Sequence, residues 1–519
     1  MDVKIRRSLG ILTVLVFLLA NVVIVSAEVP DIKSHWAEEV VTSWIGQGLI
    51  SGYEDGSFKP NDPVKRAEFV AFSNRVLKLL DKSESAFNDV SANAWYSEDV
   101  LKAVEADMIK GYGDGIFKPE APITRQEAAV VLFNAFELAV DESNSANSFA
   151  DSGKIASWAK SAVSSLYKEG YVKGRTGNNF APTDNITRAE TVAMINNIMG
   201  TLIKSGGEFT NSVKGNLVVN TANVVLKGME IEGDLYLTQG IGEGEIVLDN
   251  VIVKGRTVVK GGGSDSIVFK NTKLGKDLLV NKKGANKVRI VAQGGTEIPK
   301  VSLKSPAKLL ESELTGKGFE IVNIAVVKNV KATGNVELDG DFTDVSVDTE
   351  DSKVDVIKGT ISNINIQAKA EVSISGGTIN AIKVAPQAAA AIVSIAKVAI
   401  VKLLDVAAKA DIRIAGKLES ITVQKEAADA TINVDEGAQV LAITIEAKIT
   451  ITGKGVITTA TINVSGVVIE TKPANVTLGQ NVTSTIGEET VTGDTSSSTG
   501  GGGGGGGDDG GTTTTKTIT

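Results

Sequence analysis

The chain has 519 residues, no cysteine, one histidine and a formal net charge of −9. The lack of cysteine excludes disulfides, thiolate metal sites and a lipid-modified cysteine anchor, and one histidine leaves little for histidine-based catalysis. The negative charge gives no general support for nucleic-acid binding. With 54 glycines and only 5% aromatic residues, the composition favours thin, repetitive β structure over one thick aromatic core.

Residues 1–27 have the pattern of a secretory signal peptide. A basic start precedes an apolar run from Leu9 to Val25, which ends in the small-residue sequence VSA. An uncleaved membrane helix is the alternative, because the run is close in length to a membrane span. Asn21 and the small-residue exit favour cleavage after Ala27, so we expect an exported protein.

Three copies of one helix–loop–helix unit follow, and we place them at residues 28–85, 86–147 and 148–206. In each copy a tryptophan is followed 22 residues later by a phenylalanine, and an arginine follows the phenylalanine after eight residues. A glutamate lies two residues after each arginine. Repetition at fixed spacing is the signature of a repeat architecture. The four sets are Trp36, Trp95 and Trp158; Phe58, Phe117 and Phe180; Arg66, Arg125 and Arg188; and Glu68, Glu127 and Glu190.

The three copies also agree over longer stretches. They read HWAEEVVTSWIGQGLISGYEDGSFKPNDPVKRAE, AWYSEDVLKAVEADMIKGYGDGIFKPEAPITRQE and SWAKSAVSSLYKEGYVKGRTGNNFAPTDNITRAE. On these motifs residues 30–200 resemble three S-layer homology repeats. The resemblance implies an α-rich pseudo-trimer, with a central three-helix bundle and grooves between three lobes. In this family the grooves bind secondary cell-wall polysaccharide, often with acidic pyruvylated sugars, and so anchor exported proteins to the wall.

The second helix of each copy has a recognisable start. In a capping box a threonine and a glutamate three residues later satisfy free backbone N–H groups. The first copy has Lys65 at the cap position, so we expect an incomplete box and a weaker or altered groove there. The capping residues are Thr124 with Glu127, Thr187 with Glu190, and Glu68 in the first copy.

The arginine after each cap is harder to explain. A cation in the first helical turn faces the positive end of the helix dipole, which is mildly unfavourable. An anion docked at this turn would face both the backbone N–H groups and the guanidinium. We therefore predict that Arg66, Arg125 and Arg188 contact acidic groups of the glycan.

Other repeated residues have simpler explanations. Core packing is the default for a repeated tryptophan, but a ring edge that lines a sugar groove is compatible with it. A glycine before each turn permits tight backbone geometry and close approach of a sugar. We expect the phenylalanines to be buried plugs and the opening aspartates to brace a loop. The predicted glycan contacts therefore include Trp36, Trp95, Trp158, Gly52, Gly111 and Gly174, and the bracing aspartates are Asp31, Asp89 and Asp151.

From residue 207 to about 480, short alternating runs replace the helical periodicity. Segments that begin at residues 224, 246 and 267 align at offsets of 22 and 21. Steps of about this length match one coil of a parallel β-solenoid. A β-sandwich array is the alternative, but hairpin signals are sparse. Residues 386–410 could be a helix by their alanine content, and we predict narrow coils instead.

Residues 481–519 are rich in glycine, serine and threonine, and we expect a flexible tail or linker. The fold class is therefore multidomain, with a helical threefold module followed by an all-β parallel solenoid. Wall attachment would then depend on the N-terminal repeats.

Many β-helices are polysaccharide lyases or hydrolases, and the acid-rich segment from Asp339 to Asp355 could bind Ca²⁺. These acids lack a regular ligand spacing, and solvated turns explain them. The sequence shows no nucleophile constellation, phosphate loop or metal-ligand spacing.

We therefore predict a non-enzymatic, secreted wall protein of a Gram-positive bacterium, without a cofactor, nucleic-acid partner or membrane partner after signal cleavage. The solenoid would be a structural, self-associating S-layer or adhesive element, and a wall-anchored polysaccharide lyase or glycoside hydrolase is the alternative.

Overall fold

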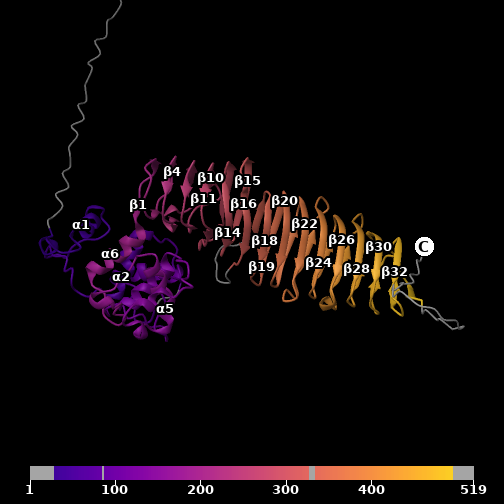
Figure 1. Ribbon diagram of the computed structural model, residues 1–519, viewed down its shortest axis with the longest axis horizontal. Helices are drawn as coiled ribbons and strands as arrows, with labels where there is room; N and C mark the ends of the chain where they lie inside the picture. The colour runs from indigo at the N-terminus through magenta and orange to yellow at the C-terminus, as the bar shows by residue number, and fades with distance from the viewer. Residues whose placement is uncertain (1–28, 85–86, 327–333, 495–519) are drawn as a thin grey trace, which may run out of the picture.

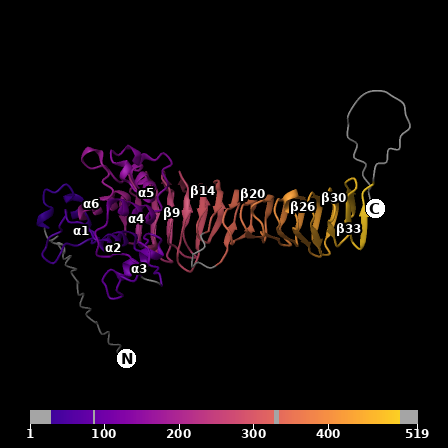
Figure 2. The same ribbon diagram turned by 90° about the horizontal axis from the view of Figure 1, so that it is seen from below.

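The computed structural model describes residues 29–84, 87–326 and 334–494 (Figure 1). A helical body lies at the N-terminal end, and a long stack of β-strands extends from it in both views (Figures 1 and 2). The fold class is therefore as predicted. The predicted signal peptide lies outside the described residues. Within these residues, no helix is both long enough and apolar enough to cross a membrane.

The helical body contains the three predicted helix–loop–helix units. In the described residues its α-helices are α1 (Glu38–Gly46), α2 (Arg66–Leu77), α3 (Ser97–Glu105), α4 (Arg125–Ala135), α5 (Ser157–Lys168) and α6 (Arg188–Met199). The segments just before α2, α4 and α6 pair with one another in a closed circle through isolated β-bridges. These bridges join Lys65 to Pro122, Thr124 to Asn185, and Pro63 to Thr187. The three repeats therefore form one pseudo-threefold module.

Each phenylalanine plug is fully buried and is held by the aspartate that opens its repeat. The Oδ1 atom of Asp31 accepts a hydrogen bond from the Phe58 amide at 2.9 Å, and Oδ2 accepts one from the Lys59 amide at 2.7 Å. Lys59 has a left-handed backbone with φ of 55°, so the carboxylate stabilises a tight turn. Asp89 and Asp151 hold the other two plugs in the same way. The predicted bracing role of the aspartates is confirmed.

The β region is a parallel solenoid with two long sheets. The first sheet contains β1 (Thr201–Ile203), β3 (Leu217–Val219), β5 (Glu230–Ile231), β6 (Leu235–Leu237), β8 (Ile252–Val253), β9 (Thr257–Val259), β11 (Lys273–Leu274), β12 (Leu278–Val280), β14 (Glu297–Leu303), β16 (Gly318–Ile324), β18 (Phe342–Val347), β20 (Thr360–Ile366), β22 (Thr378–Val384), β24 (Ile400–Val406), β26 (Lys417–Val423), β28 (Gln439–Ile445), β30 (Val456–Ile462) and β32 (Asn475–Leu478). The second contains β2 (Gly207–Phe209), β4 (Val224–Lys227), β7 (Ile246–Asp249), β10 (Val268–Lys270), β13 (Val288–Gly294), β15 (Ala307–Leu314), β17 (Val336–Asp339), β19 (Ser352–Lys358), β21 (Ala370–Ile374), β23 (Ile392–Ile395), β25 (Asp411–Ile414), β27 (Thr431–Val434), β29 (Thr450–Thr452), β31 (Val468–Ile469), β33 (Thr483–Ile486) and β34 (Glu489–Thr492).

The strand register has the predicted spacing. Val224 pairs with Ile246, and Val247 pairs with Val268, which reproduces the offsets of 22 and 21 residues. Alternate residues of each strand point inward, and they form one continuous aliphatic core along the solenoid. The alanine-rich segment forms β23 and β24, so the prediction of coils rather than a helix is confirmed.

Both predicted boundaries of the solenoid are displaced. The first strand, β1, begins at Thr201, before the expected start at residue 207. At the other end β33 and β34 form an antiparallel hairpin that reaches Thr492, inside the segment assigned to a low-complexity tail. The hairpin was missed because its threonine-rich composition resembles a linker, although Ile486 is buried in the core.

The second helix of every repeat ends against the flank of the first solenoid coils. Solenoid side chains donate hydrogen bonds to the last carbonyl groups of these helices, which would otherwise lack partners. Asn220 Nδ2 bonds Val76 O in α2 at 2.9 Å, Lys260 Nζ bonds Ala135 O in α4 at 3.1 Å, and Asn216 Nδ2 bonds Ile198 O in α6 at 2.7 Å.

An apolar row on the solenoid completes this contact. Val218, Tyr236, Val258 and Leu279 lie side by side on β3, β6, β9 and β12. They point away from the solenoid interior and belong to the same buried cluster as the helices. The two predicted domains therefore share a core, and the helical module is docked on the solenoid rather than tethered to it.

Glu137, the second residue after α4, supplies the main ion-pair cluster of this interface. Its carboxylate lies 3.3 Å from Lys260 Nζ and 2.8 Å from Lys304 Nζ, and it accepts a hydrogen bond from Asn281. Burial raises the pKa of Glu137, but the two lysines and these hydrogen bonds outweigh it and lower the pKa to about 2. The carboxylate is therefore charged in the docked state.

We predict that Glu137→Gln destabilises the docked module by up to about 3 kcal/mol at neutral pH, on the scale set by the pKa shift. Because the folded pKa is lowered, this stabilisation is present above the unfolded value near 4.5 and is lost as the pH falls toward 2. Thermal unfolding of both proteins between pH 2 and pH 7 tests this. The control is Glu120→Gln, which removes an exposed ion pair with Lys65 and should have little effect. A Glu137 effect that does not shrink in acid contradicts the prediction.

Candidate functional site

The three predicted arginines are buried at the starts of α2, α4 and α6, with exposed fractions of only 5%, 4% and 3%. Each Nε donates to the carbonyl oxygen of a plug phenylalanine in another repeat, at 2.8–2.9 Å. Each Nη1 pairs with a glutamate of that same repeat, at 3.0–3.3 Å. The sets are Arg66 with Phe117 and Glu127, Arg125 with Phe180 and Glu190, and Arg188 with Phe58 and Glu68. Because the third repeat bonds back to the first, these contacts form a closed ring, which we call the arginine ring.

The arginine ring changes the explanation of these residues. The anion that each arginine faces is a glutamate of the neighbouring repeat, so no ligand is needed to account for a cation in the first helical turn. Sequence spacing could not reveal this, since the partners lie 61 to 120 residues apart. Arg66 and Arg125 nevertheless line the floors of two grooves, and direct contact with a glycan remains a prediction.

One groove, the α6 groove, runs along α6 and has a volume of about 520 Å³. It lies between repeats, because its residues come from all three copies. The first repeat contributes a tryptophan, the second contributes a ring arginine, and the third contributes the loop and the helix. Its lining includes Trp36, Arg125, Tyr171, Lys173, Gly174, Arg175, Glu190 and Asn197.

A second groove, the α4 groove, has the same construction along α4 and a volume of about 510 Å³. Its lining includes Arg66, Lys110, Gly111, Tyr112, Glu127, Asn134 and Trp158. By the repeat register, Gly52, Trp95 and Arg188 occupy the equivalent positions along α2. The structure therefore brings predicted residues from different repeats together in two sets, each with a tryptophan, a glycine and an arginine.

The tryptophans are not packed in the core, which was the default expectation for them. Trp36, Trp95 and Trp158 have exposed fractions of 64%, 62% and 57%. Trp36 and Trp158 line the two grooves, and an amphipathic indole ring in a groove favours a binding role. The fully buried aromatic side chains of the helical body instead include the three plugs, Trp44, Phe69 and Phe136.

The loop glycines have a steric explanation, because a side chain at each of them would collide with its own loop. A Cβ atom at Gly111 would lie 2.6 Å from the carbonyl oxygen of Ile116, and one at Gly52 would lie 2.8 Å from that of Ser57. At Gly174 the nearest atom would be the side-chain oxygen of Asn178, at 2.8 Å. Each loop therefore closes on itself at the glycine, and glycan contact by this residue remains a prediction.

Sequence reasoning missed three cations of the grooves. Lys110 and Lys173 directly precede the loop glycines, whereas the first repeat has Ser51 there. Arg175 follows the glycine, where the other repeats have tyrosines. It bonds Glu190 at 2.8 and 2.9 Å. Comparison of the three copies at these positions would have found them.

Charge accumulates in the α6 groove as a result. Arg125 and Arg175 both approach Glu190, and Lys173 lies beside them. Burial raises the pKa of Glu190, but the hydrogen bonds from Arg175 and from the Thr187 amide, together with Arg125, lower it overall. Arg175 also pairs with Asp184 at 2.8 Å, so three cations face two carboxylates, and one positive charge remains for an acidic ligand.

The predicted capping boxes are confirmed at α4 and α6. The Glu127 carboxylate accepts from the Thr124 amide at 2.8 Å, and Thr124 Oγ1 accepts from the Glu127 amide at 3.4 Å. Thr187 and Glu190 make the same pair of bonds at 3.0 and 3.2 Å. At α2 only half of the box forms, from the Lys65 amide to Glu68.

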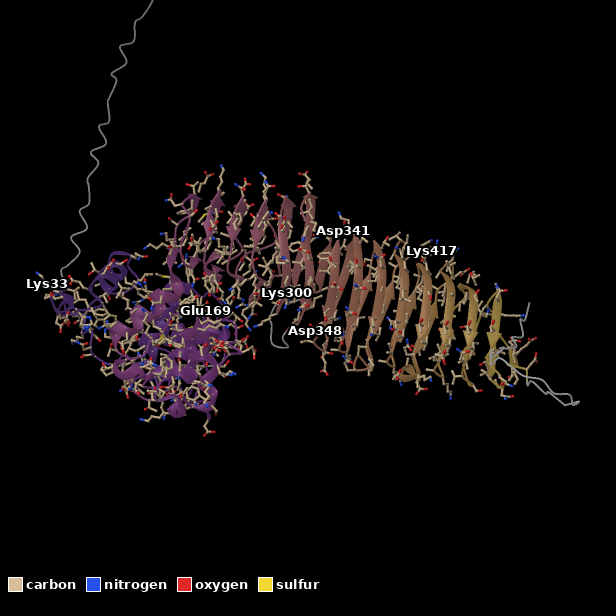
Figure 3. The ribbon with its side chains drawn as sticks, in the orientation of Figure 1. Lys33, Glu169, Lys300, Asp341, Asp348 and Lys417 are labelled. Atoms are coloured by element: carbon tan, nitrogen blue, oxygen red, sulfur yellow. The ribbon has the colours of Figure 1, made fainter. Side chains whose placement is uncertain are left out.

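The acidic residues between 339 and 355 do not gather. Asp341 and Asp348 lie at opposite edges of the solenoid (Figure 3). Asp341 accepts from the Thr360 amide, and Asp355 accepts from Ser375. Among the residues that the structure describes, no group of three or more His, Asp or Glu side chains is placed to hold a metal ion. The calcium expectation remains a prediction.

Comparison with known proteins bears on the helical module. Residues 30–70, 86–129 and 148–192 match the model of the S-layer homology domain. The chain carries three S-layer homology repeats.

Curated relatives match over stretches about as long as the three repeats. An amylopullulanase of Thermoanaerobacterium thermosulfurigenes is 36% identical over 180 residues, which is 34% of this chain and 10% of the enzyme. The surface-layer 125 kDa protein of Lysinibacillus sphaericus is 34% identical over 30% of this chain and 13% of its own length. The cellulosome-anchoring protein of Acetivibrio thermocellus is 31% identical over 28% of this chain and 34% of its own length. The chain thus spans a tenth to a third of these relatives.

The arginine ring predicts unequal effects of equivalent substitutions. Arg66→Ala leaves the partly buried Glu127 without its ion-pair partner, and we expect a loss of about 3–5 kcal/mol in the free energy of unfolding. Arg125→Ala should cost less, because Glu190 keeps its pair with Arg175. Urea unfolding followed by the fluorescence of the tryptophans measures both. Equal losses in the two variants would contradict this account.

Proposed function

We propose that this is a secreted cell-surface protein of a Gram-positive bacterium. Its S-layer homology repeats anchor it non-covalently to an acidic secondary cell-wall polysaccharide of the pyruvylated type. The composition of the two grooves carries the proposal, since each combines an exposed tryptophan with a buried arginine and an exposed lysine. Relatives named as surface-layer and cellulosome-anchoring proteins support the same role.

The grooves fit an acidic sugar in two ways. An indole ring offers an apolar face to the C–H face of a sugar, and its edge can meet polar groups. Lys173 and Arg175 line the same α6 groove as Trp36 and would bind a carboxylate on the sugar. A chain with a net charge of −9 needs such local positive sites to bind an acidic polymer.

The solenoid is, in this proposal, a structural rather than a catalytic element. Its two long, mainly parallel sheets form an elongated body that extends from the helical module (Figure 2). Its sides would serve as spacer, lattice or adhesion surfaces, and the surface-layer relatives support self-association in a layer.

We predict that replacing both Trp36 and Trp158 by alanine weakens binding to isolated cell walls by at least about tenfold, through loss of two stacking faces. Sedimentation with walls that carry pyruvylated polysaccharide, and with the same walls after its extraction, measures this.

Wild-type binding should also fall as NaCl rises from 0.15 M to 1 M, because salt screens the charged contacts. The control is Val398→Ala, an exposed apolar residue of the solenoid. Equal binding to extracted and intact walls would exclude the polysaccharide as the ligand.

A second prediction tests the role of the solenoid. The purified protein should release no reducing or unsaturated ends from acidic polysaccharides, with or without Ca²⁺, because its acidic side chains are dispersed. A colorimetric assay of reducing ends, with absorbance at 232–235 nm for unsaturated products, measures this. Activity that is lost in Asp341→Ala or Asp355→Ala would establish a catalytic solenoid and overturn this part of the proposal.

A further inference from the structure

One solenoid residue makes contact with the wall of the α6 groove. Asn216 precedes β3 and is buried between the solenoid and the end of α6. Its Nδ2 atom donates to Ile198 O at 2.7 Å and to the hydroxyl of Tyr171 at 2.8 Å. Its Oδ1 atom accepts from the Asp234 amide at 2.8 Å, which fixes the orientation of the side chain.

Tyr171 connects Asn216 to the groove. It lines the α6 groove next to Lys173 and Gly174. Its carbonyl oxygen accepts a hydrogen bond from Nδ2 of Asn197, another groove residue, at 3.1 Å. A chain of contacts therefore leads from the first solenoid coil through Asn216 and Tyr171 to Asn197, which lines the groove.

The other repeats lack this link. The positions equivalent to Tyr171 are Leu49 in the first repeat and Met108 in the second, both buried and apolar. Only the third repeat, whose last helix leads into the solenoid, has a hydroxyl group at this position. A purely packing role would be met by leucine or methionine, so the tyrosine points to the contact with Asn216.

We infer that Asn216 is a positioning residue for the α6 groove, and that the solenoid is thereby part of one wall-binding site. It acts through Tyr171, whose ring and backbone set the groove wall from which Lys173 and Arg175 extend. This inference rests on the proposed function, because it assumes that the groove binds the wall polysaccharide. Its consequence is that loss of the Asn216–Tyr171 contact should alter the α6 groove and leave the α4 groove unchanged.

The full chain allows each groove to be measured alone. In a Trp95→Ala/Trp158→Ala background the α6 groove is the one that keeps its tryptophan. There, Asn216→Ala should weaken binding to walls with pyruvylated polysaccharide by about three- to tenfold, the usual effect of one lost hydrogen bond. Tyr171→Phe should act similarly, and the double variant should lose no more than either single variant, because both break one link.

A second background separates positioning from a general loss of structure. In Trp36→Ala/Trp95→Ala the α4 groove keeps its tryptophan, and Asn216→Ala should leave binding unchanged. The matched control is Asn220→Ala, which removes a similar cap from Val76 O but contacts no groove residue of the third repeat. It should not alter binding in the first background.

Three outcomes test whether Asn216 positions the groove. Equal weakening in both backgrounds, or additive losses for Asn216→Ala and Tyr171→Phe, would show that Asn216 only stabilises the fold, and would overturn the inference. If Asn216→Ala fails to fold, Tyr171→Phe, which keeps the helix cap, still decides it, since unchanged binding refutes the link. If the wild-type protein does not bind these walls, the proposed function itself fails.

Discussion

The arginine ring is the interaction on which the helical module depends. A buried guanidinium must keep its charge paired and its N–H groups bonded, since an unpaired buried charge costs several kcal/mol. Here each repeat lacks the partners for its own arginine and takes a carbonyl oxygen and a carboxylate from another repeat. No single repeat can therefore satisfy its own core. The grooves follow from the same constraint, because they form where the arginine of one repeat meets the loop of another.

Local features of the module could be predicted from sequence, and its long-range pairs could not. The helices, the two complete capping boxes, the plugs and the bracing aspartates all depend on residues within one repeat. The partner of Arg188 is Glu68, 120 residues away, and nothing in the local pattern names it. The tryptophans were ambiguous for the same reason, since whether a ring is buried depends on the neighbouring repeat. Trp36 lies in a groove whose helix belongs to the third repeat.

In the solenoid, too, the local pattern could be predicted from sequence and the long-range contacts could not. Its register was predictable because parallel coils place equivalent residues one period apart, as with Val224 and Ile246. Docking was not predictable, because the row that contains Val218 and Tyr236 points outward yet is as apolar as the inward rows. In sequence this looks like a strand that is buried on both faces, which is common in parallel sheets. The helical module covers this face, and the domain boundary placed at residue 206 falls within the shared structure.

Docking a threefold module on the side of a rod must break its symmetry. The residues twelve positions after the ring arginines all have positive φ values, of 51°, 52° and 62°, but they are Lys78, Glu137 and Gly200. Gly200 leads into the solenoid, Glu137 binds its lysines, and Lys78 packs so closely that a side chain at Gly240 would meet it. The grooves differ accordingly, since only the α6 groove adds Arg175 and borders the solenoid through Tyr171. Three copies of one sequence motif thus become structurally different, because each meets a different part of the first solenoid coils.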